Sequence, residues 1–228
     1  MRPSGVAIAC GSGRPYLRFR RRTHLRRPDR RAKRAIRMQA LLLIDLQESF
    51  CREEGSTAPE LAREVQARGT LDNARQCLDA ARGRDDLVVF VHLAFDAEHR
   101  NRTNRTYRFD EHERAQRYMA GSAESTIVSE VAPAADELVL DKGSVGPFAS
   151  TILDAVLHAA DVEQLAICGV ATHLAVESAA RDASDLGYQV SVIRDACAAP
   201  AELHDHSLNK VLPAFAEIIT SSDFTATS

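Results

Sequence analysis

The chain has 228 residues, of which 45% are hydrophobic and 27% charged, and its formal net charge is −3. This ordinary globular composition excludes collagen-like, coiled-coil and wholly disordered chains. No apolar run approaches the roughly 20 residues that a transmembrane helix needs, so we expect a soluble protein without a membrane partner. The five cysteines (Cys10, Cys51, Cys77, Cys168 and Cys197) are widely spaced without a CxxC pair. We therefore expect reduced thiols in a cytoplasmic protein, with no disulfide framework and no structural zinc.

Positive charge is concentrated at the N-terminus. Residues 1–37 carry 12 Arg and Lys33 against Asp29, a net charge of +12, so residues 38–228 carry −15. We expect residues 1–37 to be a disordered leader and residues 38–228 to form one domain. The leader resembles a basic arm for an anionic surface or a transit segment, but we favour a third interpretation, that Met38 is the true start. The acidic body argues against a nucleic-acid partner.

From Met38 onward, strand-like apolar runs alternate with helix-like segments. We expect six strands, at residues 40–45, 86–92, 137–141, 164–168, 189–193 and 216–220. We expect helices at residues 59–82 with a break near Gly69, briefly within 94–126, at 147–160 beginning near Pro147, at 172–186 with Gly187 as C-cap, and at about 201–212. This alternation predicts an α/β fold, a three-layer αβα sandwich with a mostly parallel six-stranded sheet of Rossmann-like type.

Ligands of such sheets bind beyond the carboxyl ends of the strands, so residues that follow the strands are the candidates for a site. They are Asp45, His92, Lys142, the turn 169–175 and Asp195. Asp45 fits a partly buried general acid or base, although a helix-capping aspartate is a common alternative. An ammonium from Lys142 beside it would favour the ionised carboxylate and stabilise an oxyanion. The turn 169–175 leads into a helix, whose free N–H groups suit an oxyanion or carboxylate.

Three motifs on these strand ends resemble the isochorismatase-like hydrolases, also called cysteine hydrolases. The matching residues are Leu42-Leu43-Ile44-Asp45-Leu46-Gln47 with Phe50, Lys142 with Phe148 and Thr151, Cys168-Gly169-Val170-Ala171-Thr172 leading to 178–183, and then Gly187-Tyr188 and Asp195-Ala196-Cys197. The resemblance covers all of the chain except the leader. It implies a Rossmann-like αβα sandwich and an Asp–Lys–Cys triad.

Asp45 and Lys142 match the first two members of that triad, but Ala175 stands where the family has its nucleophile. An alanine forms no thioester intermediate. Isochorismatases proper have a small residue at this place and a histidine two positions before it, which here are Ala175 and His173. In that branch the resemblance implies that the aspartate protonates an enol ether and that water completes the cleavage. Val170-Ala171 matches the family's cis peptide.

Several further residues are expected to contact the substrate. They are Phe50, His92, Phe148, Val170, Ala171, Thr172 and His173. His92 has an equally good interpretation as a strand-end histidine bonded to the backbone. Among replacements for the nucleophile we weigh Cys168, Cys197 and Ser178, and we favour each less than chemistry without a nucleophile.

Some relatives place zinc on an Asp-x-His motif near the second strand, but residues 92–99 contain no such motif. We therefore expect no catalytic metal and no cofactor. A basic loop follows, with Arg100, Arg102, Arg105 and Arg108, and one of these arginines is a candidate for bidentate binding of a substrate carboxylate.

The function expected is that of a small-molecule hydrolase, with Asp45 as general acid or base and Lys142 as its electrostatic partner, acting on an enol ether. Two alternatives stay open. One is an amidohydrolase that acts on a small amide or ureide by direct attack of water. The other is a non-catalytic family member that serves as a binding or oligomer scaffold. We expect a homo-oligomer, either a dimer or a tetramer.

Overall fold

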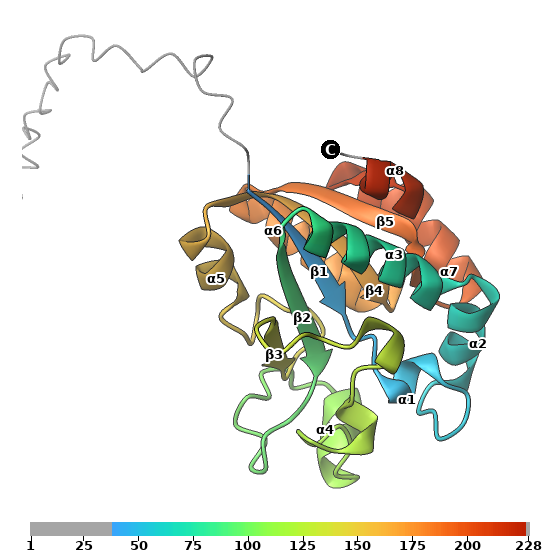
Figure 1. Cartoon of the computed structure of the whole chain (residues 1–228). Coiled ribbons are helices and arrows are strands. Elements are labelled where there is room, and N and C mark those ends of the chain that lie inside the picture. The colour runs from blue at the N-terminus through green and yellow to red at the C-terminus, as the bar shows by residue number, and fades with distance from the viewer. Residues whose placement is uncertain (1–37, 227–228) are drawn as a thin grey trace, which may run out of the picture. The chain divides into compact units, whose positions relative to one another are not determined.

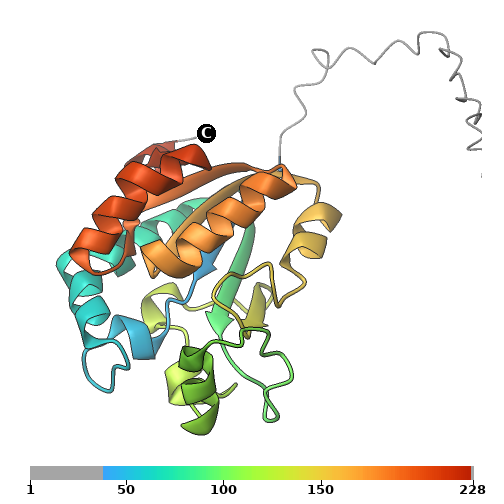
Figure 2. The same cartoon turned by 180° about the vertical axis from the view of Figure 1, so that it is seen from behind.

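A computed structural model of the chain describes residues 38–226, as Figure 1 and, from behind, Figure 2 show. The basic leader predicted at residues 1–37 lies outside the described residues. Within residues 38–226, no helix is both long and apolar enough to cross a membrane.

The centre of the domain is a parallel sheet of six strands. The strands are β1 (Met38–Ile44), β2 (Leu87–Leu93), β3 (Leu138–Lys142), β4 (Val162–Val170), β5 (Gln189–Ala198) and β6 (Glu217–Ile219). Their order is β3-β2-β1-β4-β5-β6, and every neighbouring pair is parallel. The chain winds outward from β1 in one direction and from β4 in the other, so the switch point lies between these two strands. A binding site is expected at their carboxyl ends.

Helices cover both faces of the sheet, as the sequence predicts. They are α1 (Glu48–Cys51), α2 (Pro59–Ala67), α3 (Thr70–Gly83), α4 (Tyr107–Arg114), α5 (Leu153–Ala159), α6 (Glu177–Leu186), α7 (Ala201–His206) and α8 (Ser221–Ala226). Helices α3 and α8 lie on one face, and α5 and α6 lie on the other (Figures 1 and 2). The strand runs are apolar because both faces are covered, and residues Ala40 to Ile44 are at most 1% exposed.

Short helical segments fill the connections. They are η1 (Ala123–Ser125), η2 (Ser129–Val131) and η5 (Leu212–Ala214), which are 3₁₀ turns, and η3 (Thr172–Val176) and η4 (Ser207–Val211), which are π-helical. The predicted break at Gly69 and the predicted C-cap at Gly187 are confirmed, with φ of 62° and 99° at these two glycines. Left-handed backbone of this kind costs glycine little.

Two predicted boundaries are wrong. The helix expected from Pro147 begins only at Leu153, because Thr151 bonds to Pro147 O and to the Leu153 N–H and so closes a separate turn. Strand β5 continues to Ala198, so Asp195 lies inside the strand instead of after it. The Asp195 carboxylate accepts hydrogen bonds from the N–H and hydroxyl of Ser221 at 2.7 Å each, which ties it to the start of α8. Asp195 is therefore structural.

Candidate active site

The strand ends bring Asp45 and Lys142 together. Asp45 follows β1 with φ of 54°, a left-handed backbone that is uncommon outside glycine, and Lys142 is the last residue of β3. The end of β2 lies between them in the sheet, and the lysine reaches across it, placing Nζ 2.8 Å from Asp45 Oδ2. Asp45 is 6% exposed and Lys142 is 1% exposed. The predicted acid–lysine pair is thus a buried ion pair at the switch point.

The two carboxylate oxygens of Asp45 differ in their surroundings. Oδ2 faces Lys142 Nζ, which also donates a hydrogen bond to Ser144 O at 3.0 Å. Oδ1 is buried and has no hydrogen-bond partner among residues 38–226. Burial raises the pKa of Asp45, and the charges of Lys142 and then His92 oppose that rise. A nearby Leu93 N–H adds a smaller opposing effect on the pKa, although it donates its hydrogen bond to Gln47.

This pair lies at the bottom of a small cavity of about 70 Å³. The lining is mostly apolar, and it consists of Asp45, Phe50, Ala58, Leu61, Leu93, Arg108, Phe109, His112, Lys142, Ser144, Val145, Val170, Ala171, Leu174 and Ala175. Three larger hollows, of about 520, 630 and 670 Å³, contain neither Asp45 nor Lys142. The ionisable chemistry therefore points to the small cavity.

Six of the ten candidate residues from the sequence line this cavity: Asp45, Phe50, Lys142, Val170, Ala171 and Ala175. Thr172 and His173 belong to the same turn but lie outside the lining. The Thr172 hydroxyl bonds to His204 Nδ1 at 2.8 Å, and His173 Nδ1 is buried without a hydrogen-bond partner in the described part of the chain. Phe148 packs instead near the ring of Tyr188, at 6.5 Å between centroids.

The turn after β4 presents Ala175 to the cavity. It begins with a cis peptide between Val170 and Ala171, as the family resemblance implies, and continues as the π-helix η3. Gly169 lets this turn approach β1, because a Cβ there would lie 2.0 Å from Ile44 O. Ala175 is only 3% exposed and lines the cavity with its methyl group.

The two cysteines considered as replacement nucleophiles are not available. Cys168 lies inside β4 and Cys197 inside β5, and both are fully buried. Cys197 was expected after the fifth strand, but it is the next-to-last residue of the longer β5, where it pairs with Gly169 near the carboxyl ends of the strands. Burial raises the pKa of Cys197 to about 12 and raises that of Cys168 as well. Neither thiol lines the cavity, and neither does Ser178.

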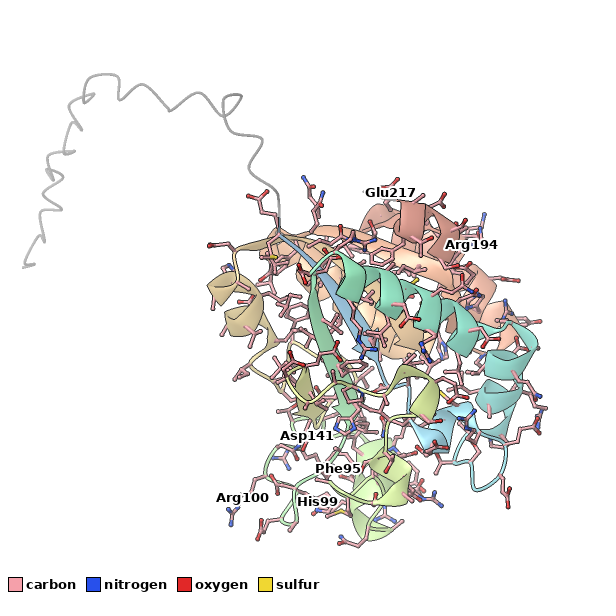
Figure 3. The ribbon with its side chains drawn as sticks, viewed as in Figure 1. Phe95, His99, Arg100, Asp141, Arg194 and Glu217 are labelled. Atoms are coloured by element: carbon pink, nitrogen blue, oxygen red, sulfur yellow. The ribbon has the colours of Figure 1, made fainter. Side chains whose placement is uncertain are left out.

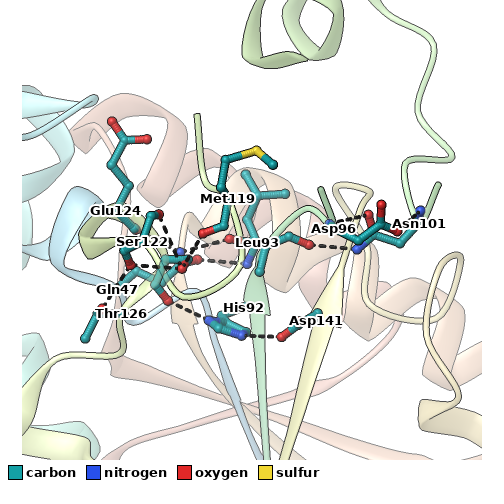
Figure 4. A network of polar contacts seen from close by, with 12 residues as sticks. Gln47, His92, Leu93, Asp96, Asn101, Met119, Ser122, Glu124, Thr126 and Asp141 are labelled. Atoms are coloured by element: carbon teal, nitrogen blue, oxygen red, sulfur yellow. Dashed lines mark hydrogen bonds and ion pairs between the residues drawn. The ribbon is translucent and has the colours of Figure 1, made fainter. Parts of the chain in front are cut away.

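His92 takes its alternative role, as a strand-end histidine bonded to the backbone. Its Nδ1 lies 2.7 Å from Ser125 O. Its Nε2 lies 2.7 Å from a carboxylate oxygen of Asp141, and Figure 4 shows His92 and Asp141 side by side. Both ring nitrogens are occupied, so His92 joins the segment at Ser125 to β3 and does not line the cavity.

Gln47 is a residue whose role the sequence did not reveal. Its side chain is fully buried, and it bonds to both the N–H and the C=O of Leu93, at 2.8 and 3.0 Å, and to Glu124 O at 3.1 Å (Figure 4). The side-chain amide of Gln47 thus continues the hydrogen bonding between β1 and β2 past the last residue of β1. The only hint in the sequence is a polar residue two positions after Asp45.

Residues 94–126, which we call the roof, supply Arg108, Phe109 and His112 to the cavity from α4. Arg102 was a candidate for substrate binding, but it is 6% exposed and pairs with Asp110 and Glu113 within the roof. Arg100 is exposed at the outer end of the same loop, beside His99 and away from the strand ends (Figure 3). Of the four arginines considered, only Arg108 reaches the cavity lining.

No group of three or more histidine, cysteine, aspartate or glutamate side chains is placed to hold a metal ion within residues 38–226.

A parallel αβα domain with a buried acid–lysine pair at its switch point belongs to the class of α/β hydrolytic enzymes. The chain belongs to the isochorismatase family, since the isochorismatase domain matches residues 39–223. It is 27% identical over 202 residues to the ureidoacrylate amidohydrolase RutB of Rhizobium rhizogenes, covering 82% of each chain. The protein is a hydrolase of this family.

Solved structures have the same fold. The fold resembles a cysteine hydrolase from Pseudomonas syringae, with a TM-score of 0.72 at 23% identity, covering 82% of this chain and 90% of that one. It also resembles N-carbamoylsarcosine amidase from Thermoplasma acidophilum, with a TM-score of 0.62 at 26% identity, covering 81% of this chain and 96% of that one.

Proposed function

We propose that this protein hydrolyses a small enol ether without a covalent intermediate, with Asp45 as general acid. One observation carries the proposal. Asp45 has one oxygen bound by Lys142 and the other buried and unpartnered, in a cavity where Ala175 presents a methyl group. A buried carboxyl oxygen without a donor favours the protonated form, and such a proton is available to a bound substrate.

The reaction balances with this one acid. Asp45 gives its proton to the terminal carbon of the C=C bond, which leaves an oxocarbenium ion and the Asp45 carboxylate. Lys142, 2.8 Å away, stabilises that carboxylate. Water attacks the carbon that bears the ether oxygen and returns a proton to Asp45, and the hemiketal then breaks into a ketone and an alcohol. No step requires a nucleophilic side chain.

The direction of the pH dependence follows from the acid role. Burial raises the pKa of Asp45, so the protonated form persists above the usual range of a carboxyl group. As the pH rises through that pKa, Asp45 loses the proton that it must donate. We therefore expect kcat/KM to fall toward alkaline pH along a limb that belongs to Asp45.

A second candidate is hydrolysis of a small amide or ureide by directly attacking water, with the Asp45 carboxylate as base. It is favoured by the similarity to proteins named ureidoacrylate amidohydrolase and N-carbamoylsarcosine amidase. It needs the ionised form of Asp45, and its rate would therefore rise with pH through the same pKa. The opposite slopes of the two pH profiles separate the candidates.

Isotope labelling tests the favoured mechanism. The purified protein is screened against carboxyvinyl ethers and small ureides, and any enol-ether turnover is repeated in D2O and in H2¹⁸O. We expect one deuterium in the methyl group of the ketone and no ¹⁸O in the alcohol, because protonation occurs at carbon and the vinyl C–O bond breaks. ¹⁸O in the alcohol would contradict the mechanism. Turnover of ureides alone would favour the second candidate, and no turnover of either class would favour a scaffold.

A further inference from the structure

Two hollows of the domain share one side chain, that of His112 on α4. His112 lines the small cavity of about 70 Å³ that contains Asp45 and Lys142. It also lines a hollow of about 520 Å³, which we call the outer hollow and which is bordered by Thr57 and by roof residues between Glu111 and Tyr118. Within residues 38–226, no other residue lines both of these spaces. His112 is therefore the place where the cavity and the outer hollow meet.

Aromatic contacts place the His112 ring between a cavity residue and a residue of the outer hollow. Its centroid lies 5.5 Å from that of Phe109, which lines the cavity, and 4.9 Å from that of Tyr118, which lines the outer hollow. The interplanar angles are 67° and 87°, which are edge-on arrangements favoured by packed aromatic rings. Phe109 and Tyr118 are 3% and 2% exposed. The three rings thus form a wall between the two spaces.

The segment before α2 borders the same two spaces at consecutive residues. Thr57 lines the outer hollow, and Ala58 lines the cavity. The Tyr118 hydroxyl donates a hydrogen bond to Thr57 Oγ1 at 2.7 Å, and the Tyr118 ring lies 5.3 Å from that of Phe50, a cavity residue. These contacts join the roof to the segment before α2, so Tyr118 is held in the wall from both directions.

His112 contributes volume to this wall and not charge. Burial, together with the charges of Arg108 and Arg117, lowers the pKa of His112 to about 4, so the ring is uncharged at neutral pH. The ring nitrogens make no hydrogen bond with any residue from 38 to 226. A phenyl ring in place of the imidazole would therefore lose no polar contact, whereas a methyl group would leave the wall open.

We propose that His112 sets the upper size of the substrate by closing the active cavity toward the outer hollow. The inference rests on the proposed function, since that function assigns the cavity to the substrate. A space of about 70 Å³ holds a molecule of only a few heavy atoms. Loss of the imidazole joins this space to the outer hollow and makes room for an added ring. The enzyme therefore selects short enol ethers, and His112→Ala admits longer ones.

Alkylation of a thiol placed in the cavity measures this limit without turnover. Ala175→Cys supplies the thiol, because Ala175 lines the cavity. Iodoacetamide is compared with iodoacetanilide, which carries the same reactive group and one additional phenyl ring, and both rates are divided by those with glutathione. With His112 present, we expect iodoacetanilide to react about tenfold or more slowly than iodoacetamide, since a packed site resists an added ring. His112→Ala in the same background should remove most of this difference, and His112→Phe should preserve it.

Arg114→Ala is the matched control, because Arg114 is an exposed residue of α4 that lines the outer hollow but not the cavity. It should leave the ratio of the two rates unchanged. Circular dichroism melting shows whether each variant retains the fold, and His112→Ser is the second small replacement if His112→Ala does not.

Three results would overturn the inference: no discrimination between the reagents while His112 is present, a ratio that a small residue at this position leaves unchanged, or an equal change of the ratio in Arg114→Ala. The outcome is independent of the reaction. A ratio that responds to His112 without any turnover of enol ethers would reject the mechanism alone. Turnover of enol ethers with a ratio that ignores His112 would reject the size limit alone.

Discussion

The floor of the cavity, formed by the ends of β1, β3 and β4, differs from the roof in how it is built. The floor places Asp45 and Lys142 at strand ends, where the sheet register fixes their positions, and Ala175 on the turn η3 that follows β4. The roof, residues 94–126, consists of the short helix α4, the 3₁₀ turn η1 and loops, and it is held by side-chain contacts such as those of Arg102 and Gln47. The comparison indicates that the floor determines the chemistry and the roof determines which molecule is admitted.

The largest effect is expected from the floor. Asp45→Asn removes the proton donor, and we expect kcat to fall by at least about 100-fold. The melting temperature should stay near that of the wild type, because the Asn oxygen still accepts a hydrogen bond from Lys142. Asp136→Asn is the matched control, since Asp136 is an exposed aspartate before β3 and lies outside the cavity lining. Full activity in Asp45→Asn would contradict the role of Asp45 as general acid.

The roof is expected to act on substrate binding. Arg102→Met releases Asp110 and Glu113, which can then approach Arg108 and misplace α4. We expect KM to rise by about tenfold or more with a smaller change in kcat, and limited proteolysis to cut the roof sooner. Arg100→Met, at an exposed arginine, should change neither. A drop in kcat alone, with KM unchanged, would contradict the division between floor and roof.

Thiol reactivity tests whether a cysteine takes part in the reaction. Four cysteines are buried, namely Cys51, Cys77, Cys168 and Cys197, and burial raises the pKa of all four thiols. For Cys51, Cys77 and Cys197 the pKa is raised to about 12. Iodoacetamide should therefore leave these four cysteines and the activity intact. Ala175→Cys adds a thiol beside Lys142, whose charge favours thiolate, and we expect alkylation there to be faster than at any of the four. Peptide mass spectrometry measures the extent of alkylation at the four native cysteines and in the Ala175→Cys variant. Loss of wild-type activity with label on Cys197 would be incompatible with this account.

The last effect concerns the pH dependence of stability. His204 bonds to Thr172, and burial lowers its pKa from 6.5 to about 4, so the folded state binds fewer protons than the unfolded state. The free energy of unfolding is therefore highest above pH 6.5, and it falls by up to about 3 kcal/mol as the pH falls toward about 4. Urea unfolding from pH 4 to 7 measures it. His204→Gln should flatten this slope, whereas His206→Gln, at an exposed histidine of the same helix, should not. Equal slopes in all three proteins would exclude His204 as the cause.

The same comparison explains what could be predicted from sequence. The floor follows local rules: apolar runs give buried parallel strands, and a polar residue after such a run faces the ligand edge. Asp45, Lys142 and the turn 169–175 were found in this way, while the missing nucleophile at Ala175 was visible only through the family resemblance.

The roof could not be predicted, because it depends on contacts between distant residues. Arg102 and Arg108 look alike in the sequence, and only the fold buries one and leaves the other at the cavity. His92 was ambiguous until Ser125 and Asp141 were placed beside it. Cys197 and Asp195 were misplaced because the apolar pattern of β5 stops at Ile193, whereas its pairing with β4 resumes at Cys197.

Intact-protein mass spectrometry during turnover tests the central claim most directly. The wild type is mixed with excess substrate, quenched in acid within the first turnovers, and weighed, with Ala175→Cys treated in the same way for comparison. Hydrolysis without a covalent intermediate predicts that the wild-type mass stays unchanged while product accumulates. A substrate-derived mass increase that forms and decays at the rate of turnover, located on any side chain of the wild type, would contradict it.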